Sequence, residues 1–133
     1  MLHVSLNPTK PLIMIVEDNQ SQAFYLEHIL TSSSYDIVLA KDGSNAIEMM
    51  TSGTIPDALI TDLNMPKKNG FELIAEMRKH KLTIPIIITS GSSDNNNFER
   101  AFVLGAQSYL VKPYPPHQLL AKLNFLLSKQ SHV

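Results

Sequence analysis

Five short apolar runs alternate with five amphipathic stretches along this chain, and that alternation leaves few folds open. The apolar runs are PLIMIV, DIVLA, DALIT, IPIIIT and SYLV, in that order. The first and fourth are apolar at consecutive positions, which is typical of short strands buried on both faces. The stretches that follow the runs repeat apolar residues every three or four positions, the spacing of one helix face. The pattern therefore predicts five strands, each followed by a helix.

The predicted helices carry terminal signals as well as apolar stripes. Ser93 or Asp94 is expected to cap the fourth helix, and Gly53 to close the second. The stripes expected on the first, third and fifth helices are Ala23, Leu26, Ile29 and Leu30, then Phe71, Ile74 and Met77, then Leu119, Leu120, Leu123, Leu126 and Leu127.

Strands that alternate with helices favour a parallel sheet covered on both faces, because a parallel pair needs a crossover connection. Right-handed crossovers leave few topologies for five such units. We therefore predict an α/β fold: a doubly wound five-stranded parallel sheet in the order 2-1-3-4-5, with five helices in the flavodoxin-like three-layer α/β/α arrangement. In such sheets the ligand site lies beyond the carboxyl ends of the strands.

Length and composition fit one globular domain. The chain has 133 residues, 44% of them hydrophobic and 17% charged, with a net charge of −1 and no cysteine. These values exclude a disulfide framework and give no general attraction to nucleic acid or an acidic membrane. We expect a cytoplasmic domain at residues 11–129, an N-terminal extension at residues 1–10 and a C-terminal tail at residues 130–133.

Polar residues stand where the predicted strands end. Glu17 and Asp18 follow the first strand and Asp62 the third, while Ser90 follows the fourth and Lys112 the fifth. Any one of them could be a helix cap, a turn residue or a solvated side chain. Together they should meet at one edge of a parallel sheet, where three carboxylates would repel one another.

A cation would relieve that repulsion, and carboxylate oxygens with open positions for water suit Mg²⁺. A carboxylate beside bound Mg²⁺ can attack phosphorus to give an aspartyl phosphate, and a lysine and a hydroxyl can hold the phosphoryl oxygens. The residues alone leave two classes of site open: a metal-dependent phosphoacceptor and a metal-assisted hydrolase.

Four segments of the chain resemble the receiver domain of two-component response regulators. IMIVEDN resembles the acidic pair of that family, DLNMPKKNGFEL its phosphoacceptor loop, IITSG its switch hydroxyl and GAQSYLVKPY its aromatic-and-lysine segment. The four segments occur in the family's order, and the resemblance covers roughly residues 11–128. It implies a phosphoacceptor signalling domain that catalyses only its own phosphorylation and dephosphorylation.

The resemblance implies a role for each matching position. Asp62 would be the phosphoacceptor, Ser90 the switch hydroxyl, Tyr109 the switch aromatic and Lys112 the phosphate-binding lysine, with a cis bond between Lys112 and Pro113. Mg²⁺ (or Mn²⁺) would be held by Asp18, Asp62 and the backbone carbonyl of Asn64, with Glu17 acting through a metal-bound water.

The resemblance also implies partners. A histidine kinase or a phosphotransfer protein would supply the phosphoryl group, and an output partner or a second copy would bind the fourth helix, fifth strand and fifth helix; no direct contact with nucleic acid or membrane is expected. Two alternatives stay open. One is a phosphatase that forms an aspartyl phosphate, and the other is a flavodoxin-like cofactor carrier, against which the acids after the first strand argue.

Two further expectations concern the fourth helix and the loop after Asp62. On the fourth helix, either Ala101 and Leu104 or Phe98 and Phe102 can face the sheet. The resemblance implies that the phenylalanines face outward beside Tyr109 as a partner surface. In the loop after Asp62, Lys67 and Lys68 are expected to be solvated, and Gly70 is expected to permit the backbone turn into the third helix.

Overall fold

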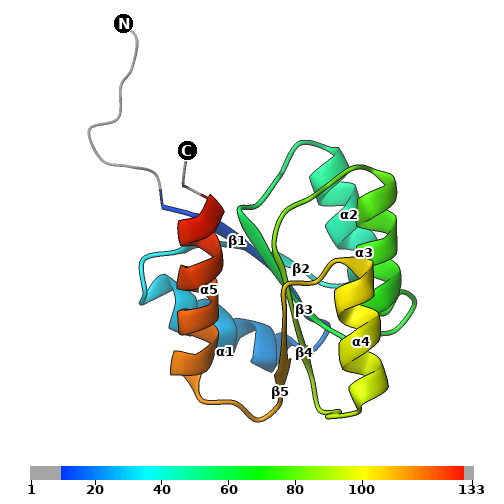
Figure 1. The fold of residues 1–133 in the computed structure, drawn as a ribbon. Coiled ribbons are helices and arrows are strands. Elements are labelled where there is room, and N and C mark those ends of the chain that lie inside the picture. Colours follow the sequence, from blue (N-terminus) through cyan, green and yellow to red (C-terminus); the bar gives the residue numbers. More distant parts are fainter. Residues whose placement is uncertain (1–9, 131–133) are drawn as a thin grey trace, which may run out of the picture.

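The computed structural model describes residues 10–130, and the five predicted strand–helix pairs are present in it (Figure 1). The strands are β1 (Leu12–Val16), β2 (Asp36–Ala40), β3 (Ala58–Asp62), β4 (Ile86–Ser90) and β5 (Ser108–Val111). The helices are α1 (Gln20–Thr31), α2 (Gly43–Thr51), α3 (Gly70–Lys79), α4 (Asn95–Leu104) and α5 (Pro116–Gln130). Residues 1–9 and 131–133, which make up most of the predicted extension and tail, lie outside the described residues.

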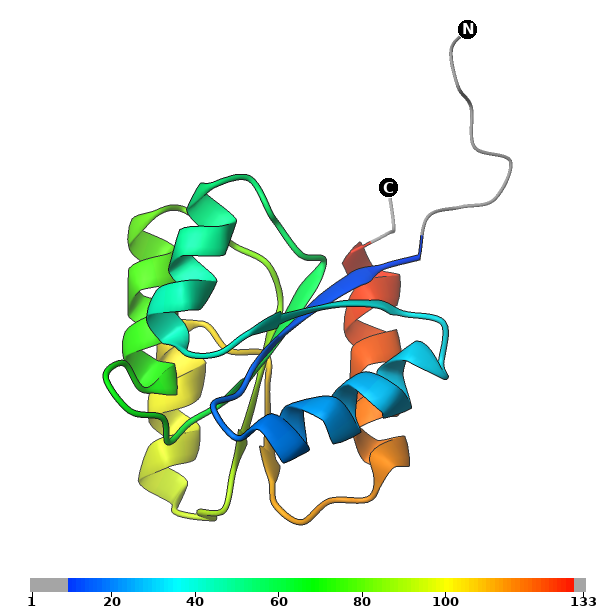
Figure 2. The same ribbon diagram turned by 180° about the vertical axis from the view of Figure 1, so that it is seen from behind.

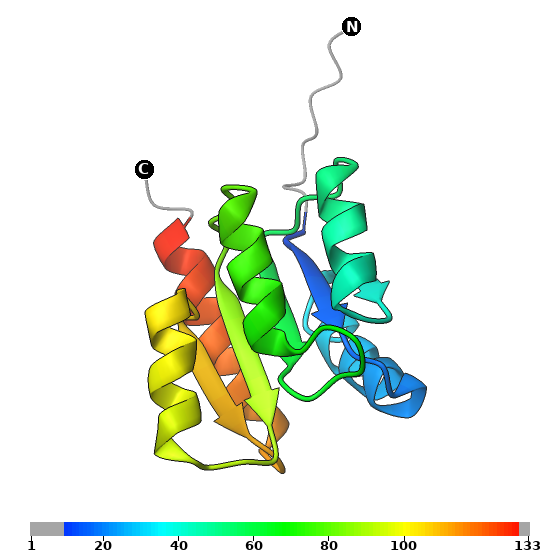
Figure 3. The same ribbon diagram turned by 90° about the vertical axis from the view of Figure 1, so that its right-hand side faces the viewer.

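The five strands form one parallel sheet in the order β2-β1-β3-β4-β5, so the predicted fold class is confirmed. Helices α1 and α5 cover one face of this sheet, and α2, α3 and α4 cover the other, as Figures 1 and 2 show from opposite sides. Figure 3 looks onto the face covered by α2, α3 and α4, with the sheet behind these helices. Because every strand runs the same way, all five carboxyl ends lie at one edge of the sheet.

Alternate strand residues build two separate cores, one under each helical layer. Met14 and Val16 of β1 point toward α2, α3 and α4, whereas Ile13 and Ile15 point toward α1 and α5. All four are at most 1% exposed. Both faces of β1 are thus covered, which explains why its sequence is apolar at consecutive positions instead of alternating.

Short polar side chains cap the helices at the carboxyl edge of the sheet. Each N-cap oxygen accepts a backbone N–H two or three residues along, and the capping residues are Asn19, Asp42, Asn69 and Asp94. The predicted cap at Asp94 is confirmed. Past the end of α2, Gly53 has φ 113°, which a glycine adopts at little cost, and this agrees with its predicted place.

The predicted apolar stripes are buried to different degrees. Phe71, Ile74 and Met77 of α3 are fully in the core. On α1 three of the four predicted residues are buried and Ile29 is only partly so. On α5 the buried residues are Leu119 and Leu123, and the other three leucines pack at the margin of that core. Within residues 10–130, no helix is long and apolar enough to cross a membrane.

On α4, Ala101 and Leu104 face the sheet, and the two phenylalanines point away from it. Ala101 is completely buried and Leu104 packs against the same core, whereas Phe102 is 52% exposed. Phe98 is half-buried, and its ring lies edge-on to the Tyr109 ring with 4.5 Å between the centroids. Phe102 is thus exposed as expected, whereas Phe98 is half-buried against Tyr109, the neighbour expected for it.

Candidate functional site

Three carboxylates meet where β1 and β3 end. Glu17 and Asp18 follow β1, Asp62 is the last residue of β3, and the two strands are neighbours in the sheet. One oxygen of each side chain lies within 4.8 Å of an oxygen of the other two. This spacing places hard oxygen donors around a volume that one divalent cation could fill, which is the donor chemistry that Mg²⁺ requires.

Glu17 is the buried member of this cluster. Its side chain accepts a hydrogen bond from the Asn19 backbone N–H at 3.1 Å. Burial is the main reason that the pKa of Glu17 is raised above its ordinary value of 4.5, and the negative charges of Asp62 and Asp18 raise it further. The Asn19 bond and the Lys112 charge act in the opposite direction. A carboxylate in these surroundings is stabilised by any added positive charge.

Lys112 brings a positive charge to the cluster from the end of β5. Its Nζ atom lies 3.3 Å from Oδ2 of Asp62 and 3.6 Å from Oε1 of Glu17. Its backbone N–H donates to the Ser90 carbonyl at 2.7 Å, and its peptide bond to Pro113 is cis, as the resemblance implied. The Lys112 side chain therefore reaches from the edge strand β5 to the acids at the ends of β1 and β3.

A short chain of hydrogen bonds joins Ser90 to Tyr109. Ser90 is fully buried at the end of β4, and its Oγ atom accepts a bond from the Ser92 N–H at 3.1 Å. The Ser92 carbonyl in turn accepts a bond from the Tyr109 hydroxyl at 3.0 Å. A movement of the Ser90 hydroxyl would therefore displace Ser92, whose carbonyl accepts the hydrogen bond from the Tyr109 hydroxyl.

The loop from Asp62 to α3 turns tightly, and Gly70 fits it for a reason other than the expected one. Its backbone N–H donates to the Leu63 carbonyl at 2.8 Å. A Cβ atom at Gly70 would lie 3.0 Å from the Asp62 carbonyl oxygen and 3.1 Å from Leu63 Cα, with no positive φ at this position. The requirement is close backbone approach and not conformational freedom, so the predicted reason was wrong.

The expectation that Lys68 is merely solvated is also wrong, whereas Lys67 is exposed as expected. The Lys68 ammonium is ion-paired with Glu76 of α3. Its methylene carbons lie over Gly43, where an added Cβ would be 3.0 Å from Lys68 Cδ. One side chain thus ties the loop to the start of α2 and the middle of α3.

The geometry of this edge agrees with the result of a family comparison. Residues 13–124 match the family model described as the response regulator receiver domain. This chain is a response regulator receiver domain. It is thus a phosphoacceptor signalling module of two-component systems and not an enzyme that acts on other substrates, which confirms the predicted family and class.

Relatives of this receiver domain occur in longer proteins. It is 36% identical over 118 residues to the response regulator ArlR of Staphylococcus saprophyticus, covering 89% of this chain and 53% of that protein. It is 36% identical over 121 residues to the sensor histidine kinase TmoS of Ectopseudomonas mendocina, covering 90% of this chain and 12% of the kinase. The chain therefore spans about half of one relative's length and a small part of the other's.

Solved structures give the same fold. The receiver domain of a histidine kinase from Syntrophus aciditrophicus superimposes with a TM-score of 0.83 at 32% identity, covering 92% of this chain and 94% of that one. The receiver domain of the Francisella response regulator 1452 gives a TM-score of 0.86 at 24% identity, which supports the fold alone, and the match covers 92% of this chain and all of that one. Receiver domains bind Mg²⁺ at an acidic pocket and receive phosphoryl groups from histidine kinases, and the carboxylate cluster is the candidate pocket here.

One contact of this receiver domain's site was not predicted. The side-chain oxygen of Gln22, in the first turn of α1, accepts a hydrogen bond from Lys112 Nζ at 2.9 Å. Gln22 lies four residues after Asp18, on a helix that sequence analysis treated only as a cover for the sheet. No sequence pattern marked it, because a glutamine in a first helical turn is common and its partner is 90 residues away.

Proposed function

We propose that this receiver domain accepts a phosphoryl group on Asp62 from a histidine kinase or phosphotransfer protein in the cytoplasm, with Mg²⁺ (or Mn²⁺) as the required cation. The observation that carries the proposal is the position of Asp62 inside the cluster of Glu17 and Asp18, with Lys112 Nζ 3.3 Å from its Oδ2 atom. This combination gives one carboxylate access to both a metal and a fixed ammonium group.

Asp62 is the best placed nucleophile of the three acids. Glu17 is buried, and its oxygens face the Asn19 N–H and Lys112. Asp18 is exposed at the start of the loop after β1. Asp62 is partly exposed, and its Oδ1 atom accepts the Asn64 N–H at 3.3 Å. Its carboxylate can therefore meet a donor from solvent while its backbone remains paired in the sheet.

The reaction is a displacement at phosphorus. An oxygen of Asp62 forms the new bond to phosphorus, and the bond between phosphorus and the donor histidine nitrogen breaks. The nitrogen keeps that electron pair as the imidazole leaves. Lys112 and the Ser90 hydroxyl would contact the oxygens of the transferred group, where negative charge is concentrated.

The residues present suit a divalent cation. Asp18, Asp62 and the Asn64 carbonyl would hold it directly, and Glu17 would hold one of its water molecules. A bound cation supplies positive charge that lowers the repulsion between the carboxylates and the incoming phosphoryl group. In this scheme Glu17 orients water while remaining hydrogen-bonded to the Asn19 N–H.

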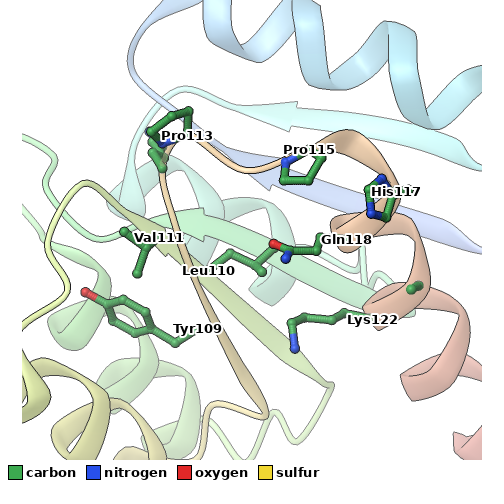
Figure 4. Close-up of a pocket in the computed structure, with 10 residues that line it drawn as sticks. Tyr109, Leu110, Val111, Pro113, Pro115, His117, Gln118 and Lys122 are labelled. Atoms are coloured by element: carbon green, nitrogen blue, oxygen red, sulfur yellow. The ribbon is translucent and has the colours of Figure 1, made fainter.

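We further propose that phosphorylation is read out at the face formed by α4, β5 and α5, through the surface of Phe98, Phe102 and Tyr109. The link from Ser90 through Ser92 to the Tyr109 hydroxyl supports this, because the phosphoryl group would draw on the Ser90 hydroxyl. Figure 4 shows Tyr109 and Val111 on β5, beside a groove bordered by Gln118 and Lys122 of α5. A partner or a second copy that binds there would contact the tyrosine directly.

The test of the phosphoacceptor is incubation with a small acyl phosphate, with and without Mg²⁺. We expect one acid-stable, base-labile phosphoryl group per chain, formed only with a divalent cation present and absent from Asp62→Asn. Asp18→Ala should lose cation binding, because one direct ligand is removed. Undiminished phosphorylation of Asp62→Asn would show that the nucleophile is another residue.

A further inference from the structure

Lys112 is held at the site by a residue outside the carboxylate cluster, and we infer that this residue, Gln22, is a positioning residue for phosphoryl transfer. The inference rests on the proposed function of Asp62 and Lys112 and adds a third element, α1, to the machinery. Its role would be to keep the Lys112 ammonium group in place when Glu17 and Asp62 interact with the cation or the phosphoryl group.

The surroundings of the Lys112 ammonium carry the inference. Among the described residues, its Nζ atom contacts three side-chain oxygens: Gln22 Oε1 at 2.9 Å, Asp62 Oδ2 at 3.3 Å and Glu17 Oε1 at 3.6 Å. An ammonium has three N–H donors and no acceptor. The three oxygens come from α1, β3 and β1, so the donors are directed to three different elements. Gln22 makes the shortest of the three contacts.

The chemistry of the contact fixes which end of the Gln22 amide faces the lysine. The amide NH₂ is a donor and cannot bond to an ammonium, so the oxygen must point to it. The Gln22 backbone N–H is bound by the Asn19 side chain at 2.9 Å, which holds the first turn of α1 in place. The base of the side chain is therefore anchored, and its tip reaches back toward the carboxyl edge of the sheet.

Gln22 differs from the other two partners in what happens to it during the reaction. Glu17 and Asp62 are carboxylates that a divalent cation would engage, and an oxygen of Asp62 forms the new bond to phosphorus. A bound cation would compete with Lys112 for both carboxylates, and phosphorylation would remove the negative charge of the Asp62 carboxylate. Gln22 is neutral, and it takes part neither in cation binding nor in the phosphorylation of Asp62. Its bond is thus the one that can persist through the reaction and keep a flexible lysine, with its large rotamer entropy, directed at the site.

The test is Gln22→Met, which keeps the length and helix propensity of the side chain and removes the acceptor. Glu48→Met is the control, because Glu48 is an exposed polar side chain of similar length on α2 and does not belong to the carboxylate cluster. Both changes are also made in a Lys112→Met background. The measurements are the phosphorylation rate with a small acyl phosphate over a range of Mg²⁺ concentrations, and the melting temperature.

We expect Gln22→Met to lower the phosphorylation rate at saturating Mg²⁺ by about three- to tenfold, the size of the net contribution of one ordinary hydrogen bond. The Mg²⁺ concentration for half the maximal rate and the melting temperature should stay as in the wild type, as should the phosphorylation rate of Glu48→Met. In the Lys112→Met background, Gln22→Met should have no further effect, since it acts through that lysine. An unchanged rate, a rate loss that persists without Lys112, or a parallel loss of Mg²⁺ affinity would each overturn the inference.

A second readout needs no phosphorylation. In the metal-free protein labelled with ¹⁵N-lysine, the ammonium signal of Lys112 should be observable in the wild type and broadened by exchange with water in Gln22→Met. If the wild type accepted no phosphoryl group, the proposed function would fail, and this signal would still decide whether Gln22 holds Lys112. An identical Lys112 signal in the two proteins would overturn the inference directly.

Discussion

Phe98 and Phe102 lie one turn apart on α4, and their exposure sets what each contributes to stability. Phe98 is half-buried against the Tyr109 ring, whereas Phe102 is 52% exposed. Ala101, between them in sequence, occupies the side of the helix that faces the sheet. Neither phenylalanine belongs to the buried core on this side of the sheet.

Changing each phenylalanine to alanine separates these roles. Phe102→Ala should cost under about 1 kcal/mol of unfolding free energy, as surface changes do. Phe98→Ala should cost about 1–2 kcal/mol, because it gives up the edge contact with Tyr109. The core-side control, Leu104→Ala, should cost about 2–5 kcal/mol. Urea unfolding measures all three.

The double variant of Phe98 and Phe102 should keep normal phosphorylation and lose partner binding or phosphate-dependent dimerisation. Analytical ultracentrifugation with and without the phosphodonor measures the phosphate-dependent dimerisation. A loss of about 3–5 kcal/mol for either single change would identify that residue as a core aromatic and remove the basis for the partner surface.

Some residues of the site could be placed from the sequence, and others could not. Asp62, Ser90 and Lys112 could be placed at one edge because each follows a strand, and parallel strands end together. Gln22 and Lys68 could not be placed, because their contacts depend on where long side chains reach after the helices have packed. Gly70 was chosen correctly for the loop, but the reason lies in a distance to the Asp62 carbonyl that no sequence pattern encodes.

At the scale of elements, the loop between β3 and α3 is fixed by Lys68. Its ion pair with Glu76 and its packing over Gly43 connect the loop to two helices. The hydrogen bond from Lys68 is the main cause that lowers the pKa of Glu76 below its ordinary value of 4.5, and the charges of Lys68, His80 and Lys79 lower it further. The loop that carries Asn64 is therefore held in part by a titratable contact.

This contact predicts a pH dependence with a definite sign. Because the folded pKa of Glu76 is lowered, the pair stabilises the fold fully above the ordinary value of 4.5, and the contribution is lost as pH falls through the lowered pKa. Glu76→Gln should therefore be less stable than the wild type at pH 7, and the difference should shrink in acid below pH 4.5. Urea unfolding from pH 7 to pH 3 measures it, with the exposed Glu48→Gln of α2 as the control. A gap that is the same at every pH would show that Glu76 acts by packing alone.

The strands and helices themselves were predictable because local and tertiary requirements agree. Both faces of β1, β3 and β4 are covered, so their sequences are apolar throughout, and Asn19, Asp42, Asn69 and Asp94 are favourable caps where helices begin. The fourth helix is where the pattern alone failed to decide. Its two apolar stripes are comparable, and Ala101 and Leu104 are the ones that pack against the core once α4 lies against α3 and β5.

For the whole molecule, the carboxylate cluster couples cation binding to stability. Glu17, Asp18 and Asp62 repel one another in the metal-free protein, and a cation that binds the folded state alone stabilises it. At ten times its dissociation constant, Mg²⁺ should add about 1.4 kcal/mol, which corresponds to a melting temperature about 5 °C higher.

The comparison that checks this uses two variants. Asp18→Ala should show no rise in melting temperature with Mg²⁺, and without Mg²⁺ it should melt above the wild type because one repulsive charge is gone. Asp36→Asn removes an exposed carboxylate at the opposite edge of the sheet and should respond to Mg²⁺ like the wild type. Equal Mg²⁺ responses in all three proteins would locate the bound cation away from this cluster.

The strand order has a consequence for the way the chain is made. β1 lies between β2 and β3 in the sheet, so residues 12–62 contain the three adjacent strands and all three acids of the cluster. Ser90 and Lys112 follow with β4 and β5, which add to one side of that unit. During synthesis from the N-terminus, the emerging segment therefore gathers its negative charges before the lysine that balances them has been added. The negative charges of the site are thus encoded on the chain ahead of the positive charge that lies beside them in the folded domain.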